Sequence, residues 1–150
     1  HSRLIAGDTV DLYINFVTQN WMLIIALFVI LGMLFFNLFG SRLRGYTPIG
    51  PAESVKLINQ EDAIVLDVRE PKEYQGGHIL NSIHIPQSAL AKRITELEKY
   101  KSRPVIVGCR SGSRSSFACG LLKKQGFENV YNLSGGVMAW QNANLPLTRK

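Results

Sequence analysis

The segment Cys109-Arg110-Ser111-Gly112-Ser113-Arg114 combines a nucleophile with groups that bind anions. It follows a charge-free apolar run, Val105–Gly108, that is typical of a buried strand, and residues Ser115 to Gln125 are typical of a helix. A cysteine between a strand end and a helix start lies beside free backbone N–H groups and the positive end of the helix dipole. Together with two guanidinium groups, these donors favour a thiolate. The segment therefore predicts nucleophilic sulfur chemistry at Cys109 on an anionic substrate, with Arg110 to Ser115 as the anion-binding loop.

Two more polar residues follow a second apolar run. Asp67 and Arg69 come directly after Ala63–Leu66. We expect Asp67 to cap the following turn and Arg69 to brace the loop that carries the cysteine. Arg114 has two possible roles, which are to stabilise the thiolate and orient an anionic donor, or to pair with a carboxylate such as Asp67 or Glu70.

Strand-like and helix-like segments alternate through the last hundred residues. The predicted strands lie around residues 46–49, 63–66, 82–85, 105–107 and 130–133, and the central ones are rich in β-branched residues. Helical patterns separate them, with Pro51 at one helix start and Gly126 as a C-cap. This order predicts an α/β fold, an open parallel five-stranded sheet with helices on both faces. Ligands of such sheets bind beyond the carboxyl ends of the strands, where Cys109 and Asp67 are expected.

Several motifs between Thr47 and Pro146 occur in the order and spacing of one family. They are Asp67-Val68-Arg69-Glu70, Glu73-Tyr74, Gly77-His78-Ile79, Ser82-Ile83-His84-Ile85-Pro86, the cysteine loop, and Leu133-Ser134-Gly135-Gly136-Val137-Met138-Ala139-Trp140. In these motifs the chain resembles a single-domain rhodanese-like sulfurtransferase. Six residues from Cys109 to Arg114 match the rhodanese loop, whereas the phosphatases of the same fold have a loop one residue longer. Gly108 departs from the pattern, because many relatives have an aromatic residue there.

The resemblance implies an enzyme that carries sulfane sulfur as a persulfide on Cys109. It would pass that sulfur from a small donor, such as thiosulfate or a persulfide, to a thiol acceptor or, in vitro, to cyanide. The resemblance implies no metal and no organic cofactor. Two alternatives stay open: a non-catalytic, membrane-tethered interaction module, and a phosphatase or arsenate-reductase-like enzyme, which the short loop disfavours.

The N-terminal part contains a segment suited to a membrane. No charged residue occurs from Leu12 to Ser41, and Trp21 to Phe39 is almost wholly apolar. A transmembrane helix needs about 20 such residues, so one helix is predicted to span the membrane before the soluble domain. Arg42 and Arg44 follow the span, whereas Asp8 and Asp11 precede it. The positive-inside rule predicts an outer N-terminus and a cytoplasmic rhodanese domain, at a bacterial inner membrane.

These observations divide the chain into five parts. We expect an N-terminal lead over residues 1–20, interfacial in character and with His1 as a cloning remnant, and a transmembrane helix over 21–39. A linker over 40–46, a rhodanese domain over 47–146 and a C-terminal tail over 147–150 complete the division.

The overall composition limits the partners. The formal net charge is +6, with 17 Lys and Arg against 11 Asp and Glu, but the basic residues are scattered. We therefore expect the membrane and membrane or cytosolic proteins as partners and no nucleic acid. Cys109 and Cys119 do not form a disulfide framework, and we expect Cys119 to be a buried core thiol.

Overall fold

The computed structural model describes residues 2–150, and the side chains of residues 7–40 and 45–150. His1, the expected cloning remnant, lies outside the described residues, as do the side chains of Arg42 and Arg44. The chain divides into two compact units, with the boundary between Gly40 and Ser41.

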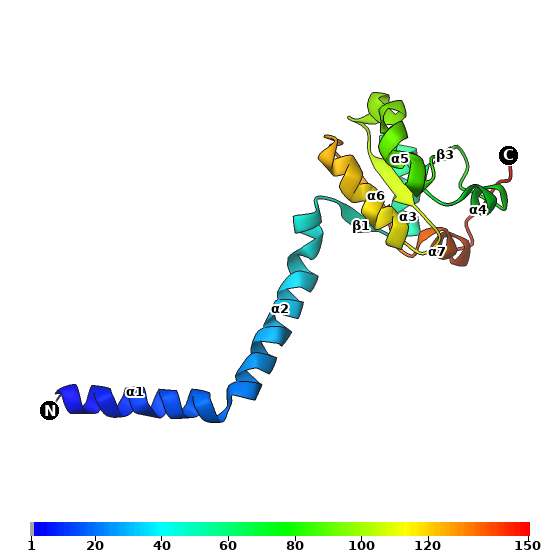
Figure 1. Ribbon diagram of the computed structural model, residues 1–150. Coiled ribbons are helices and arrows are strands. Elements are labelled where there is room, and N and C mark those ends of the chain that lie inside the picture. Colours follow the sequence, from blue (N-terminus) through cyan, green and yellow to red (C-terminus); the bar gives the residue numbers. More distant parts are fainter. Residues whose placement is uncertain (1) are drawn as a thin grey trace. The chain divides into compact units, whose positions relative to one another are not determined.

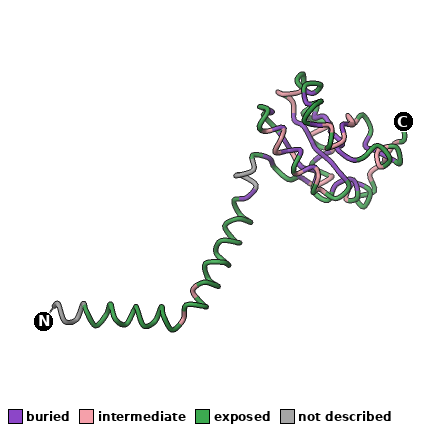
Figure 2. The backbone as a smooth tube through the Cα atoms, viewed as in Figure 1, coloured by how far each residue is buried: buried purple, intermediate pink, exposed green. Residues whose placement is uncertain are grey.

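The first unit is helical, and its described side chains, those of residues 7–40, belong to no hydrophobic core. Helix α1 (Ser2–Gln19) and helix α2 (Trp21–Arg44) meet at Asn20, whose side-chain amide donates to the carbonyl of Phe16. Most apolar residues between Trp21 and Phe39 are exposed, and this part of the backbone trace is largely green in Figure 2. Within the described residues, Trp21–Gly40 is the one helix long and apolar enough to cross a membrane. The segment expected as a linker is largely helical, because α2 continues to Arg44 and ends at Gly45, whose φ is +77°.

The second unit is built on a parallel sheet of five strands in the order β1-β5-β4-β2-β3, which confirms the predicted fold class. The strands labelled in Figure 1, β1 and β3, are the two edges of this sheet. The strands are β1 (Thr47–Ile49), β2 (Ile64–Asp67), β3 (Ile83–His84), β4 (Val105–Gly108) and β5 (Val130–Leu133). The connecting helices are α3 (Pro51–Glu61), α4 (Pro71–Gln75), α5 (Gln87–Arg93), the 3-10 helix η1 (Ile94–Tyr100), α6 (Ser113–Lys124) and α7 (Gly136–Asn142).

Alternation along the strands produces two cores. In β4, Val105 and Val107 point to the core covered by α5 and α6, whereas Ile106 points to the core that contains Trp140 of α7. Side chains of α3 pack on the second core. Since both faces of the central strands are covered, these strands are fully buried (Figure 2) and hold the loops at their ends in fixed positions.

Two details differ from expectation. The helical segment expected between the third and fourth strands is split between α5 and the 3-10 helix η1, although Leu90 and Leu97 are both buried. The expected C-terminal tail is attached to the domain, because Thr148 exchanges two backbone hydrogen bonds of 2.8 Å with His78.

Candidate active site

The loop that carries Cys109 lies at the carboxyl edge of the sheet. It connects β4, the central strand of the sheet, to α6, and Gly108 is in register with Asp67 of β2. The structure thus brings together the two groups of residues that the sequence analysis singled out, the cysteine loop and the segment after β2.

The sulfur of Cys109 is held by donors of its own loop. The amide nitrogen of Gly112 donates to Sγ across 3.0 Å, and the Ser115 hydroxyl lies 3.4 Å from it. Burial by itself would raise the pKa of this thiol. The hydroxyl of Ser115 and the backbone N–H groups of Ser115, Gly112 and Ser111 outweigh burial and lower the pKa below its usual range. The loop is therefore built to hold negative charge on sulfur.

A buried asparagine organises the base of the loop. Asn132 of β5 accepts a hydrogen bond of 2.5 Å from the Ser115 hydroxyl, and its amide group donates to the Gly112 carbonyl and to the Ser116 hydroxyl. Ser115 has one hydroxyl proton, for which the Asn132 side chain, the Gly112 carbonyl and the cysteine sulfur compete as acceptors. The charge on the sulfur is thus coupled to this network.

The start of α7 fixes the other side of the loop. The amides of Val137 and Met138 donate to the carbonyl oxygens of Cys109 and Arg110 across 2.8 and 3.1 Å. Because a trans peptide points its N–H opposite to its C=O, these bonds turn the amides of Arg110 and Ser111 away from α7. A Cβ on Gly136 would lie 2.4 Å from both carbonyl oxygens, and its φ is +62°. Only glycine fits at this close approach.

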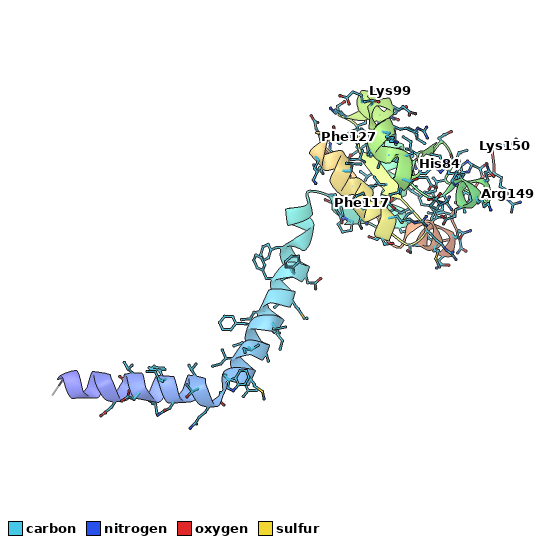
Figure 3. The ribbon with its side chains drawn as sticks, in the orientation of Figure 1. His84, Lys99, Phe117, Phe127, Arg149 and Lys150 are labelled. Atoms are coloured by element: carbon cyan, nitrogen blue, oxygen red, sulfur yellow. The ribbon has the colours of Figure 1, made fainter. Side chains whose placement is uncertain are left out.

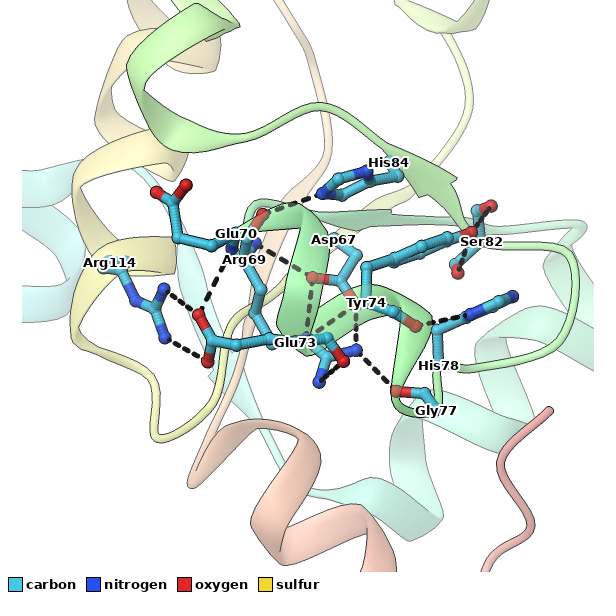
Figure 4. Close-up of polar contacts among 10 residues, drawn as sticks. All are labelled: Asp67, Arg69, Glu70, Glu73, Tyr74, Gly77, His78, Ser82, His84 and Arg114. Atoms are coloured by element: carbon cyan, nitrogen blue, oxygen red, sulfur yellow. Dashed lines mark hydrogen bonds and ion pairs between the residues drawn. The ribbon is translucent and has the colours of Figure 1, made fainter. Parts of the chain in front are cut away.

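Arg114 is committed to an ion pair. Its guanidinium donates two hydrogen bonds, of 2.7 and 2.9 Å, to the carboxylate of Glu73 in α4 (Figure 4). The hydrogen bonds from Arg114 lower the pKa of Glu73 to about 2. The carboxylates named from the sequence, Asp67 and Glu70, are not the partner. This pair ties the helix after the loop to the segment after β2.

Asp67 and Arg69 form a buried ion pair that shapes the β2–α4 connection. Asp67 accepts from the backbone N–H of Arg69 and from its guanidinium, which also donates to the carbonyls of Glu73 and Gly77 (Figure 4). Asp67 thus caps the turn, as expected. Arg69 stabilises α4, and Glu73 of this helix pairs with Arg114. Arg69 therefore acts on the cysteine loop only indirectly, through α4.

One arginine of the loop remains exposed. Arg110 faces a pocket of about 320 Å³ beside the loop, which is lined by Arg69, Glu73, Arg110, Val137, Met138 and Gln141. Among the described residues, Arg110 forms no ion pair. The pocket therefore offers the positive charge of Arg110 to an incoming anion beside the cysteine loop.

The second cysteine lies apart from this chemistry. Cys119 is fully buried in the core under α6, where it donates to the Tyr131 carbonyl across 3.6 Å. Burial raises the pKa of this thiol to about 12, and the charge of Cys109 adds to the rise. The expectation of a core thiol is confirmed.

Three residues of the site were not singled out from the sequence. Glu73 and Gly136 entered only as parts of motifs. Asn132 was not considered, although a polar residue near the carboxyl end of an otherwise apolar strand, Val130–Leu133, is a usable signal.

The fold and the cysteine loop define a class of protein, and comparison with known proteins agrees. Residues 50–143 match the model of the rhodanese-like domain, so the chain belongs to this family. It is 34% identical to a rhodanese-related protein of Thermoplasma volcanium, whose crystal structure superposes with a TM-score of 0.63 over 70% of this chain and 100% of that one.

Two relatives show which parts of the chain are shared with known proteins. The chain is 38% identical to the uncharacterized protein YibN of Escherichia coli over 90% of its own length and 95% of the relative's, so that likeness extends beyond the rhodanese-like domain into the N-terminal helices. It is 37% identical to the thiosulfate sulfurtransferase GlpE of Pseudoalteromonas translucida over 63% of this chain and 89% of that protein.

Proposed function

We propose that this protein is a membrane-anchored sulfurtransferase that carries sulfane sulfur as a persulfide on Cys109. The observation that carries the proposal is the contact between the Gly112 amide and Sγ, in a six-residue loop whose donors lower the pKa of the thiol. The likeness to a thiosulfate sulfurtransferase supports the same activity.

In the first half of the reaction, the Cys109 thiolate attacks the outer sulfur of a donor such as thiosulfate. The S–S bond of thiosulfate breaks and sulfite leaves with the bonding electron pair, so the cysteine becomes a persulfide anion. Arg110 is placed to attract the dianionic donor into the adjoining pocket. The amides that face the sulfur then stabilise the charge on the persulfide.

In the second half, a thiophilic acceptor attacks the outer sulfur of the persulfide. Cyanide yields thiocyanate and a thiolate acceptor yields a new persulfide, and in both cases the bonding pair returns to Cys109 as thiolate. Covalent storage on the cysteine divides one transfer into two easier steps.

The loop must open for this chemistry. Cys109 has no exposed surface, and the bonds from Gly112 and Ser115 close over its sulfur. Arg114 is held by Glu73 and α7 holds the carbonyls of Cys109 and Arg110. Movement is thus expected at Ser111 and Gly112, between the two anchored ends.

We further propose that α2 spans a membrane once and that the sulfurtransferase domain faces the cytoplasm. The support is a helix of suitable length and hydropathy, Trp21–Gly40, followed by Arg42 and Arg44. A reducing compartment suits a cysteine that works as thiolate and persulfide.

Thiocyanate formation from thiosulfate and cyanide tests the activity, with phosphatase activity measured beside it. We expect the full chain to form thiocyanate, Cys109→Ser to form none, and Cys119→Ala to keep most of the activity because that thiol is buried and protonated. Phosphatase activity without sulfur transfer, or no activity of either kind, would refute the proposal.

A further inference from the structure

Helix α6 buries one face and exposes an apolar one. Ser115, Ala118, Cys119 and Leu122 are buried. The opposite face carries Phe117, Gly120, Leu121 and Lys124 at helical spacing, and Phe117 is 65% exposed (Figure 3). This face forms part of a groove of about 720 Å³, which we call the α6 groove. It is lined by Tyr46, Ser116, Phe117, Gly120, Leu121, Lys123 and Lys124.

The charge of the α6 groove has one sign. Lys123 and Lys124 lie along it, and no carboxylate is among the described residues that line it. The ammonium group of Lys123 donates to the Glu128 carbonyl across 2.7 Å, which holds this lysine at the end of α6. An exposed aromatic ring and a leucine beside two lysines are the combination that binds the headgroup region of an anionic bilayer.

The chain enters the domain beside this groove. Helix α2 ends at Arg44, and a Cβ on the next residue, Gly45, would lie 3.5 Å from the side chain of Lys123. Tyr46, which follows, lines the groove. Consecutive Cα atoms are about 3.8 Å apart, and Tyr46 is two residues after the end of α2. An α2 inserted in the membrane would therefore keep the groove near the bilayer surface. A short tether supplies a high effective concentration, so a small patch is sufficient for binding.

We propose that the α6 groove docks on anionic phospholipid headgroups of the membrane that holds α2. The proposal rests on the anchoring by α2 proposed above. Docking would set the orientation of the domain on the membrane. It would also leave the Cys109 loop open to substrate, because no residue of that loop is among the described residues that line the groove.

Photo-cross-linking of the full chain in nanodiscs tests the docking. The probe residue p-benzoylphenylalanine is placed at Phe117 or, as the matched control, at Leu80, which is 68% exposed outside the groove. The nanodiscs contain phosphatidylcholine alone or mixed with phosphatidylglycerol, and mass spectrometry identifies the cross-linked species. We expect the probe at position 117 to add phospholipid mass several-fold more often than the probe at position 80, in anionic nanodiscs only.

Reversing the charge of Lys124 tests whether the groove binds anionic headgroups or only lies close to the membrane. One lysine near an anionic surface contributes about 1 kcal/mol, or about fivefold in binding. Lys124→Glu should therefore reduce lipid cross-linking at position 117 by at least about fivefold, and high salt should do the same. Lys56→Glu, an equally exposed change on α3, should leave the yield unchanged.

Three results would overturn the docking: equal yields at positions 117 and 80, equal yields in the two kinds of nanodisc, or cross-linking of position 117 to a second chain, which would make the groove an interface between copies. Co-elution of the chain with nanodiscs tests the anchor separately. If the chain does not co-elute with nanodiscs, both the anchoring and the docking proposals are refuted. Thiocyanate formation tests the sulfurtransferase activity independently of either.

Discussion

The amide nitrogen of Val137 donates a hydrogen bond of 2.8 Å to the carbonyl oxygen of Cys109, so the last helix of the domain holds the backbone of the proposed nucleophile. The contact joins residues 28 positions apart in sequence, and it requires that the residue before Val137 has no side chain. The geometry of the sulfur site thus depends on backbone hydrogen bonds from a helix that is distant in the sequence.

We predict that Gly136→Ala destabilises the domain by about 3 kcal/mol and abolishes sulfur transfer. A methyl group would meet two carbonyl oxygens of the loop at 2.4 Å, and the left-handed backbone adds strain. Urea unfolding and thiocyanate formation are the measurements. Gly120→Ala is the control, since nothing lies within 4 Å of its added methyl group and alanine favours the helix by about 1 kcal/mol. Equal stability of the two variants would contradict the close approach.

We predict that Ser115→Ala raises the pKa of Cys109. The Ser115 hydroxyl, 3.4 Å from the sulfur, is one of the groups that lower this pKa, and its loss leaves the effect of burial, which raises the pKa, less opposed. The rate of alkylation by iodoacetamide, followed against pH, gives the pKa. The inflection should move to higher pH in Ser115→Ala and stay in place in Ser113→Ala, whose side chain is exposed on the same turn. An unchanged inflection in Ser115→Ala would show that backbone amides alone stabilise the thiolate.

The sequence predicted the strands and the position of the nucleophile, but it did not predict many of the contacts that hold the cysteine loop. The apolar runs placed the strands, and a cysteine directly after one of them placed the nucleophile at the carboxyl edge of the sheet. Glu73 was missed as the partner of Arg114 because the two are 41 residues apart and pair only after α4 and α6 have packed. Local spacing carries no information on such a contact, and Asp67 and Glu70 offer a carboxylate just as Glu73 does.

The same limit applies to the loop itself. The sequence suggested that both guanidinium groups stabilise the thiolate, yet the donors closest to the sulfur are a hydroxyl and backbone amides. Which way those amides point depends on α7 and on Asn132, both distant in the chain. A linker was expected from residue 40, but α2 continues to Arg44. The reason for this error is different: polar residues after an apolar run mark the end of a membrane span, but they do not end a helix.

We predict that Glu73→Gln lowers the free energy of unfolding near neutral pH and that the loss disappears in acid. The ordinary pKa of this carboxyl is 4.5, and the pair with Arg114 lowers the folded-state pKa to about 2. The unfolded state therefore binds the proton more readily, so the stabilisation is complete above 4.5 and is lost as the pH falls toward 2. Urea unfolding of the wild type and the variant over this range measures the difference.

The control for this pair is Glu96→Gln. Glu96 pairs with Arg93, but both side chains are largely exposed, so its removal should change stability little at any pH. If the two variants lose equal stability near neutral pH, the Glu73–Arg114 pair is an ordinary surface contact. A pH-independent loss in Glu73→Gln would mean that the carboxylate charge is not what stabilises the fold.

We predict that α2 crosses the membrane once, with the domain after Gly45 on the cytoplasmic side. Arg42 and Arg44 follow the span and resist translocation, while the acidic Asp8 and Asp11 precede it. Protease added to intact bacterial spheroplasts that contain the full chain should leave the domain uncut, and permeabilised spheroplasts should allow cleavage. Replacement of Arg42 and Arg44 by Glu should place a fraction of the molecules in the opposite orientation, because local charge then no longer favours one side. Cleavage of the wild-type domain in intact spheroplasts would reverse the topology and expose Cys109 to an oxidising compartment, where a persulfide is harder to maintain.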